Sequence, residues 1–291
     1  MKIKKAGILA LAGLAWGLSM APVSAEVTYI PQSALQASTG YYTDTIGGGL
    51  GTAVTMTGGG NAANVGGQRN DDGFSGPIAL NWTNPLSFFG NDYTQFYANN
   101  NGNISFNGGI SAFTPSGPQG ATQPIISPFF ADVDTRNLLS GLMHVRNDLD
   151  QLIVTWDSVG YYSSHADKLN SFQLVLRGAD YEVPVGQGRI GFFWNTMGWE
   201  TGDASGGSGG FGGTPGAVGF GDGLNSGYVL TGSTLNGIAG VVQNHQLWFD
   251  INDGGEPVVI PGIPEPEIYA MMGLGLGLMG WVARRRKQQA A

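Results

Sequence analysis

Short apolar segments, separated by glycine, asparagine, proline and aspartate, are the feature that most constrains the fold of this chain. Between residues 74 and 250 these segments are about five or six residues long, the usual length of a β-strand. Residues 171–177 alternate in polarity, so Phe172, Leu174 and Leu176 share one face of a strand. Outside the termini, no stretch repeats apolar residues with helical spacing over three turns. The pattern predicts an all-β fold, with a β-sandwich-like architecture.

Other segments also have the composition or alternation of strands. Residues 142–146 and 151–157 are separated by four turn-forming residues, which predicts a hairpin with a four-residue turn. Further predicted strands cover residues 94–98, 103–107, 189–194 and 247–251. The last two are the most apolar, so we expect them near the centre of a sheet.

The composition fits a folded β domain with long loops. The chain contains 50 glycines in 291 residues, far above the usual frequency of about 7%, but no Gly-X-Y period. Aromatic residues make up 11% of the chain, which argues against disorder. Residues 202–223 contain eleven glycines and form either a flexible surface loop or a ligand-binding loop. The absence of cysteine excludes thiol catalysis and cysteine-based zinc sites.

The N-terminus has the three parts of a secretory signal peptide, predicted at residues 1–25. An apolar run at residues 6–18 follows the charged start, and Val23-Ser24-Ala25 supplies the small residues of a cleavage site. We expect cleavage between Ala25 and Glu26. The charged start consists of Lys2, Lys4 and Lys5.

The exported part is strongly acidic. Residues 26–263 contain six Lys and Arg and nineteen Asp and Glu, which gives a net charge of −13. Such a surface cannot replace the counterions that phosphates hold, so nucleic acid is excluded as a partner.

The C-terminus combines a spacer, a short apolar segment and a basic end. Residues 252–263 are rich in glycine and proline, which predicts a semi-extended linker. Residues 268–283 would form a helix of about 24 Å, and a membrane span needs about 20 apolar residues. The basic residues that follow would keep the end of the chain in the cytoplasm. These features predict transient membrane insertion, with an ordinary membrane anchor as the alternative.

Residues 264–291 resemble the PEP-CTERM sorting signal of Gram-negative bacteria. The resemblance implies export across the inner membrane and recognition and cleavage by an exosortase. It further implies location at the cell surface or in the extracellular matrix, and an association with exopolysaccharide and biofilm. The residues that carry it are Pro264, Glu265, Pro266, Arg284, Arg285, Arg286 and Lys287.

The middle of the chain resembles a second family. Residues 125–136 read Ile-Ile-Ser-Pro-Phe-Phe-Ala-Asp-Val-Asp-Thr-Arg, and motifs at 156–162, 167–173 and 202–207 follow in order. This series is similar to the nidogen-like (NIDO) domain of extracellular proteins, which we place at residues 74–251. Residues 26–73, rich in glycine, threonine and asparagine, are then a loose lead-in or a set of edge strands.

The NIDO resemblance implies a non-catalytic adhesion protein that binds matrix polysaccharide or a surface protein. Exposed aromatic side chains are candidates for the binding surface, with a place in the core as the alternative. A secreted hydrolase of matrix polysaccharide and a self-associating matrix protein are the competing functions. The aromatic candidates are Trp156, Tyr161, Tyr162, Trp194 and Trp199.

Asp132 and Asp134 lie two positions apart after an apolar strand, so they are expected on one face with Arg136. Either Arg136 and backbone N–H groups satisfy these carboxylates, or the two carboxylates bind Ca²⁺ with loop carbonyls. Further carboxylates that would complete such a site are Asp157, Asp167 and Asp203.

No sequence pattern in this chain predicts catalysis. The histidines are widely spaced, without the i, i+4 pairs of zinc enzymes, and are expected at the surface. Ser163-Ser164-His165 precedes Asp167, but a Gly-x-Ser-x-Gly elbow is absent. The sequence therefore predicts a non-enzymatic protein. The three histidines are His144, His165 and His245.

Overall fold

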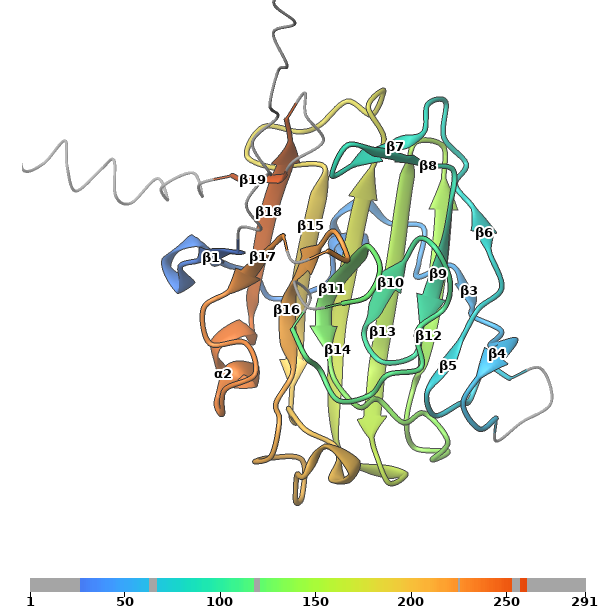
Figure 1. Cartoon of the computed structure of the whole chain (residues 1–291), viewed down its shortest axis with the longest axis vertical. Helices are drawn as coiled ribbons and strands as arrows, with labels where there is room; N and C mark the ends of the chain where they lie inside the picture. The colour runs from blue at the N-terminus through green and yellow to red at the C-terminus, as the bar shows by residue number, and fades with distance from the viewer. Residues whose placement is uncertain (1–26, 63–66, 118–120, 225, 253–256, 261–291) are drawn as a thin grey trace, which may run out of the picture.

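Two β-sheets packed face to face form the folded part of the protein (Figure 1). The computed structural model describes residues 27–62, 67–117, 121–224, 226–252 and 257–260. The predicted signal peptide with its cleavage site at Ala25 and Glu26, and the whole sorting signal at 264–291, lie outside these residues. Within the described ranges, no helix is long and apolar enough to cross a membrane.

One sheet, the long-stranded sheet, has the order β19-β18-β15-β14-β13-β12-β3, with β2 beside β18. Within the described residues, its strand pairs are antiparallel. Its strands are β2 (Gln36–Ala37), β3 (Thr52–Ala53), β12 (Leu142–Asp148), β13 (Gln151–Tyr161), β14 (His165–Arg177), β15 (Ile190–Met197), β18 (His245–Ile251) and β19 (Pro257–Val259).

The other sheet, the short-stranded sheet, has the order β1-β17-β16-β11-β10-β9-β5-β4, with β6 beside β9. Strands β1 and β17 are parallel, and the other pairs among the described strands are antiparallel. Its strands are β1 (Val27–Ile30), β4 (Gly58–Gly59), β5 (Gly73–Phe74), β6 (Ile78–Ala79), β9 (Gln95–Asn99), β10 (Asn103–Ser105), β11 (Ile125–Phe130), β16 (Ala217–Gly221) and β17 (Gly227–Leu230).

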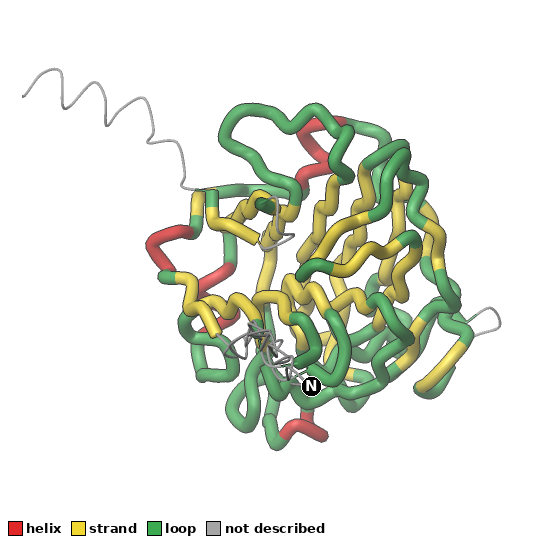
Figure 2. Tube along the Cα trace, turned by 45° about the horizontal axis from the view of Figure 1, so that its top comes forward, coloured by secondary structure: helices red, strands yellow, loops and turns green. Residues whose placement is uncertain are grey.

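The remaining elements lie outside the two sheets. Strands β7 (Leu86–Phe88) and β8 (Asn91–Tyr93) form a separate hairpin. Two helices of five residues, α1 (Tyr42–Ile46) and α2 (Ile238–Val242), lie at the periphery of the strands (Figure 2). Two 3₁₀ turns cover Gln32–Ala34 and Asp203–Ser205. The predicted all-β sandwich is therefore confirmed.

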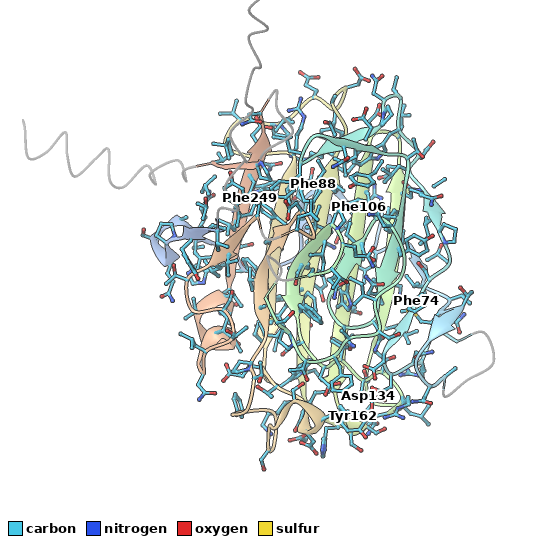
Figure 3. All side chains as sticks on the ribbon, in the orientation of Figure 1. Phe74, Phe88, Phe106, Asp134, Tyr162 and Phe249 are labelled. Carbon is cyan, nitrogen blue, oxygen red and sulfur yellow. The ribbon has the colours of Figure 1, made fainter. Side chains whose placement is uncertain are left out.

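The main core lies between the sheets and is rich in aromatic rings. Phe220 of β16 packs edge-on against Phe249 of β18, with 4.9 Å between ring centroids, and against Phe192 of β15 at 6.4 Å. Figure 3 shows Phe88, Phe106 and Phe249 gathered in one half of the sandwich. Such rings bury large apolar areas and account for much of the stability of the packed sheets.

The alternation predicted for residues 171–177 is confirmed in β14. Phe172, Leu174 and Leu176 lie in the main core, while Val175 packs on the outer face with α1. Arg177 also lies on that outer face, fully buried, and its guanidinium stacks 4.5 Å from the Trp248 ring centroid. Residues 170–177 of this strand are buried on both faces because α1 and its flanking segment cover the outer one.

The predicted hairpin is present, but its turn is shorter than expected. Asp148 pairs with Gln151, so only Leu149 and Asp150 form the turn rather than four residues. Asp150 adopts a positive φ of 54°, and its carboxylate accepts hydrogen bonds from the N–H and hydroxyl of Thr83. These contacts stabilise the two-residue turn, so the pairing of β12 with β13 continues up to Asp148 and Gln151.

Strands β15 and β18 occupy the predicted positions near residues 189–194 and 247–251, and they pair with each other. Residues 26–73 contribute β1 to β4 and most of the segment leading to β5, with β1 beside β17 and β2 beside β18. Within the predicted linker, Pro257–Val259 forms β19 on the edge of β18. Proline is tolerated there because it begins an edge strand.

A buried carboxylate network as the candidate functional site

Polar side chains gather at one end of the sandwich, where several loops meet. Asp134 and Tyr162 lie at this end, away from the labelled aromatic residues of the core (Figure 3). Isolated bridges join Asp71 to Asp134 and Val133 to Tyr161, so three chain segments come together here. The loop that follows β11 is therefore held between residues 69–72 and the β13–β14 connection.

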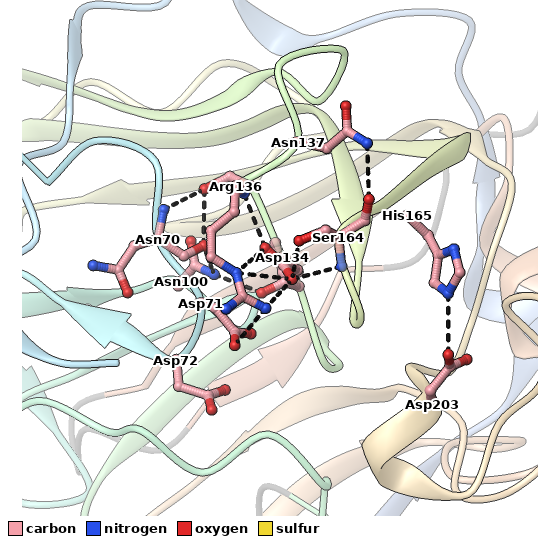
Figure 4. A network of polar contacts seen from close by, with 12 residues as sticks. Asn70, Asp71, Asp72, Asn100, Asp134, Arg136, Asn137, Ser164, His165 and Asp203 are labelled. Atoms are coloured by element: carbon pink, nitrogen blue, oxygen red, sulfur yellow. Dashed lines mark hydrogen bonds and ion pairs between the residues drawn. The ribbon is translucent and has the colours of Figure 1, made fainter. Parts of the chain in front are cut away.

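Asp134 is fully buried and fully paired. Arg136 Nη2 lies 2.6 Å from Asp134 Oδ2, and Arg136 Nε lies 3.0 Å from Oδ1 (Figure 4). The backbone N–H groups of Arg136 and Ser164 donate to the same carboxylate at 2.9 and 2.7 Å. These hydrogen bonds and the charge of Asp134 raise the pKa of Arg136 above its ordinary value. Of the two alternatives stated for this carboxylate, Asp134 therefore fits the first, in which Arg136 and backbone N–H groups satisfy it.

A second group of carboxylates lies beside this pair. Asp71, Asp72 and Asp132 each offer a carboxylate oxygen, and the three oxygens lie within 4.8 Å of one another. Arg136 Nη2 contacts Asp71 Oδ2 at 2.9 Å, and Asn101 Nδ2 donates to Asp72 Oδ1 at 2.8 Å. We call Asp71, Asp72 and Asp132 the aspartate cluster.

Two oxygens of the aspartate cluster are buried without a hydrogen-bond partner among the described residues: Asp71 Oδ1 and Asp132 Oδ2. Burial, with the nearby charges of Asp134 and Asp72, raises the pKa of Asp71 to about 7. Burial, with the charges of Asp72 and Asp71, raises the pKa of Asp132 to about 8. Burial likewise raises the pKa of Asp72. Ionisation of the cluster is therefore unfavourable unless a positive charge lies beside it.

Buried asparagines in the β9–β10 turn hold the backbone of the network. Asn100 Nδ2 donates to the carbonyls of Val133 at 2.6 Å and Asn70 at 3.1 Å. Asn101 Oδ1 accepts the N–H of Val133 at 3.0 Å. Sequence reasoning did not identify these residues or Asp71 and Asp72. The signals were four asparagines within residues 99–103 and an Asp-Asp-Gly run at 71–73, both of which are also common in simple turns.

The other predicted carboxylates have separate roles. His165 Nε2 lies 3.0 Å from Asp203 Oδ2, both partly exposed, at the edge of the network (Figure 4). Asp167 accepts the Tyr161 hydroxyl at 2.9 Å and Lys168 Nζ at 2.6 Å. His165 thus pairs with Asp203 and not with Asp167, the aspartate that follows it in the sequence.

Asp157 and the remaining histidines lie in other parts of the sheet. Asp157 accepts the Tyr41 hydroxyl at 2.9 Å. His144 lies in β12 and His245 in β18, which are separated by three strands. The group of convergent ligand atoms found among the described residues contains no histidine.

The expectation of exposed aromatic residues is wrong for four of the five candidates. Trp156, Trp194 and Trp199 are fully buried, and Tyr161 is 1% exposed. The indole N–H groups of the three tryptophans donate to the carbonyls of Asn100, Pro128 and Val159, respectively. Each indole ring therefore packs in the core while its N–H bonds to a backbone carbonyl. A place in the core was the alternative stated for these aromatic residues. Tyr162 is partly exposed.

Comparison with known proteins identifies two segments of the chain. The family model described as NIDO related matches residues 35–218. The model of the PEP-CTERM protein-sorting motif matches residues 262–287. No solved structure matches this chain significantly.

Curated relatives are large proteins of which this chain matches a small part. Alpha-tectorin of Mus musculus is 34% identical over 204 residues, which cover 60% of this chain and 9% of alpha-tectorin. Alpha-tectorin of Homo sapiens is 33% identical over the same length. Nidogen of Drosophila melanogaster is 28% identical over 136 residues, 36% of this chain and 10% of nidogen. The chain thus spans about a tenth of these relatives, and by its family match over most of its sandwich it belongs to the NIDO-related family.

Proposed function

We propose that this chain is an exported, non-catalytic protein that binds a component of the extracellular matrix, and that an exosortase cleaves its tail. The observation that carries the proposal is the combination in one chain of a NIDO-related domain and a PEP-CTERM protein-sorting motif. An association with biofilm and exopolysaccharide, expected for proteins with this tail, belongs to the same proposal. Before cleavage, the short apolar segment at 268–283 would enter the inner membrane of a Gram-negative cell.

The burial of Asp132 and Asp134 argues against these two carboxylates as the catalytic pair of the competing hydrolase. Glycoside hydrolysis needs two carboxyl groups that flank a bound sugar. Asp132 and Asp134 are 1% and 0% exposed, and Asp134 is held by Arg136 and two backbone N–H groups. A polysaccharide therefore cannot reach this pair without displacing the loops around it.

Two exposed leucines lie at the end of the sandwich that carries the network. Leu138 and Leu139 are 82% and 78% exposed in the loop between β11 and β12. Asn137 Nδ2 donates to the Ser164 carbonyl, and the Asp203 N–H donates to the Tyr162 carbonyl. Hydrogen bonds thus connect the β11–β12, β13–β14 and 198–216 loops into one surface, which we call the loop end. We propose the loop end as the binding surface.

The proposal is tested on the protein recovered after export from cells that contain an exosortase. We expect its mass to lack residues up to Ala25 and the residues beyond the Pro-Glu-Pro motif. We expect it to co-sediment with matrix from the producing cells without releasing reducing ends. Matrix treated with periodate or with protease distinguishes a polysaccharide ligand from a protein ligand.

Paired variants locate the surface. Leu138→Ser with Leu139→Ser should weaken co-sedimentation at least about tenfold, because apolar contacts at an interface centre carry much of the affinity. Val185→Ser is the matched control, since Val185 is 91% exposed in the β14–β15 loop at the opposite end. Equal binding by both variants would refute the loop end as the surface. Release of reducing ends, or recovery of the uncleaved chain, would refute the proposed function itself.

A further inference from the structure

We propose that Asp71, Asp72 and Asp132 form a binding site for a divalent cation, and that the cation is Ca²⁺. The site lies at the loop end, between the segment that precedes β5 and the segment that follows β11. It differs from the pair expected from the sequence, because Asp134 is occupied by Arg136 and two residues from a distant segment take its place.

The spacing of the oxygens suits one ion. Calcium binds oxygen ligands at about 2.3–2.6 Å, so two ligands on opposite sides of one ion lie about 5 Å apart. One carboxylate oxygen from each of the three aspartates lies within 4.8 Å of the other two. One ion can therefore contact all three without a change of backbone.

The second observation is the pair of unpartnered oxygens. Asp71 and Asp132 are 2% and 1% exposed, and Asp71 Oδ1 and Asp132 Oδ2 have no hydrogen-bond partner within the described part of the chain. A buried ionised carboxylate without a partner is strongly unfavourable, and proteins pair such groups or use them to coordinate metals. Both oxygens belong to residues of the aspartate cluster, so a cation bound to the cluster would supply a positive partner for these carboxylates.

Within the described residues, basic side chains offset only part of the charge of the ionised cluster. Arg136 shares its guanidinium between Asp134 and Asp71. Among the described residues, no basic side chain forms an ion pair with Asp72 or Asp132. With Asp134 included, the group has four carboxyls, and the Arg136 guanidinium bonds to two of them, Asp134 and Asp71. A divalent cation supplies the charge that the protein does not.

The cluster is also held in place before any ion binds. Asn101 fixes Asp72 through its Nδ2 and fixes the N–H of Val133 through its Oδ1, so one side chain sets the spacing of both segments. On the other side, Gly202 approaches Asp132 so closely that a Cβ there would lie 2.4 Å from Asp132 Oδ2. Preorganised ligands bind more tightly because little conformational entropy remains to be lost.

The chemistry of the ligands selects among cations. All three ligands are carboxylates, without histidine or cysteine, which suits hard cations rather than Zn²⁺. Magnesium requires near-ideal octahedral geometry at about 2.0–2.1 Å, whereas calcium accepts irregular sets of oxygens. Three aspartates converging from two loops favour Ca²⁺.

Calcium titration of the full-length chain in detergent tests the proposal. After treatment with a chelator, Ca²⁺ at about 10 mM should raise the midpoint of thermal unfolding by about 3 °C or more, given dissociation constants of about 10⁻⁴–10⁻³ M for extracellular sites. Magnesium at the same concentration should give a smaller rise. Calorimetric titration should give binding of one Ca²⁺ per chain.

Two variants test the residues. Asp132→Asn keeps the shape of the side chain and should reduce the Ca²⁺-induced rise to within about 1 °C, while leaving the cation-free protein as stable as before or more so. Asp72→Asn provides a second test if the first variant folds poorly. Asp167→Asn, at an exposed carboxylate outside the cluster, is the matched control and should keep the full rise. Absence of a Ca²⁺-induced rise in the natural chain, or its persistence in both cluster variants, would overturn the proposal.

Discussion

At the scale of single residues, Asp132 and Asp134 show how neighbouring carboxylates acquire different roles. They lie two positions apart, yet Asp134 accepts hydrogen bonds from Arg136 and Ser164, while Asp132 faces Asp71 and Asp72. The difference arises from what each side chain meets in the folded protein. The Asp134 carboxylate stabilises a loop through its hydrogen bonds. The ionised form of Asp132 is unfavourable unless a positive charge lies beside it.

The raised pKa values of Asp71 and Asp132 predict a pH dependence of stability. A carboxyl group titrates near pH 3.9 in the unfolded chain, whereas the folded-state pKa values are about 7 and about 8. The folded state thus binds more protons than the unfolded state across this interval. Its stabilisation from these groups is complete below the unfolded pKa and is lost as the pH rises through 7 to 8.

In the presence of a chelator, which removes divalent cations, we therefore expect the natural chain to have a lower midpoint of thermal unfolding at about pH 8.5 than at about pH 5. Asp132→Asn should show a smaller decrease over the same interval, because it removes one of the titrating groups. Thermal unfolding followed by intrinsic tryptophan fluorescence measures both. A midpoint that rises with pH in the natural chain, or an equal decrease in the variant, would contradict the assignment.

At the scale of elements, glycines determine how closely turns approach the next strand. Gly102, in the β9–β10 turn, has a φ of 77°, and a Cβ there would overlap the carbonyl oxygen of Phe129. Gly90, in the β7–β8 turn, has a φ of 71°, but a Cβ there would meet nothing within 4 Å. The two glycines share a backbone conformation and differ only in their surroundings.

Gly102→Ala and Gly90→Ala separate these two effects. Gly90→Ala should destabilise the protein by about 1–2 kcal/mol, the cost of a left-handed conformation for a residue with a Cβ. Gly102→Ala should cost at least about 2 kcal/mol more, because the turn or β11 must also move. Denaturant unfolding at equilibrium measures both free energies. Similar values for the two variants would show that the close approach to Phe129 relaxes freely.

At the scale of the whole molecule, contacts between distant segments hold the sandwich together. The chain enters both sheets near its N-terminus, with β1 beside β17 and β2 beside β18. Between the sheets, Phe220 of β16 contacts Phe192 and Phe249 of the long-stranded sheet. Interactions of this kind form only when the whole chain has folded, so we expect one cooperative transition.

Phe220→Ala should destabilise the whole molecule by about 3–5 kcal/mol, because it leaves a cavity between the sheets. Tyr29→Ala should change the free energy of unfolding by less than about 0.5 kcal/mol, since Tyr29 is 66% exposed on β1. Urea unfolding provides the measurement, with an unchanged denaturant dependence showing that cooperativity is kept. A partial transition in Phe220→Ala would show instead that the two sheets unfold separately.

By itself the sequence determined the class of fold, the main strands and the family. Alternation at residues 171–177 identified the two faces of β14, and the motif at 125–136 identified the NIDO-related domain, because both depend on residues close together in the chain. The burial of Trp156 and Trp194 and the convergence of Asp71 with Asp132 follow from contacts between distant segments of the folded chain. Local patterns give the direction of a side chain from its strand, but its surroundings come from segments far away in the chain. That is why Asp134 met an arginine and Asp132 met two more carboxylates.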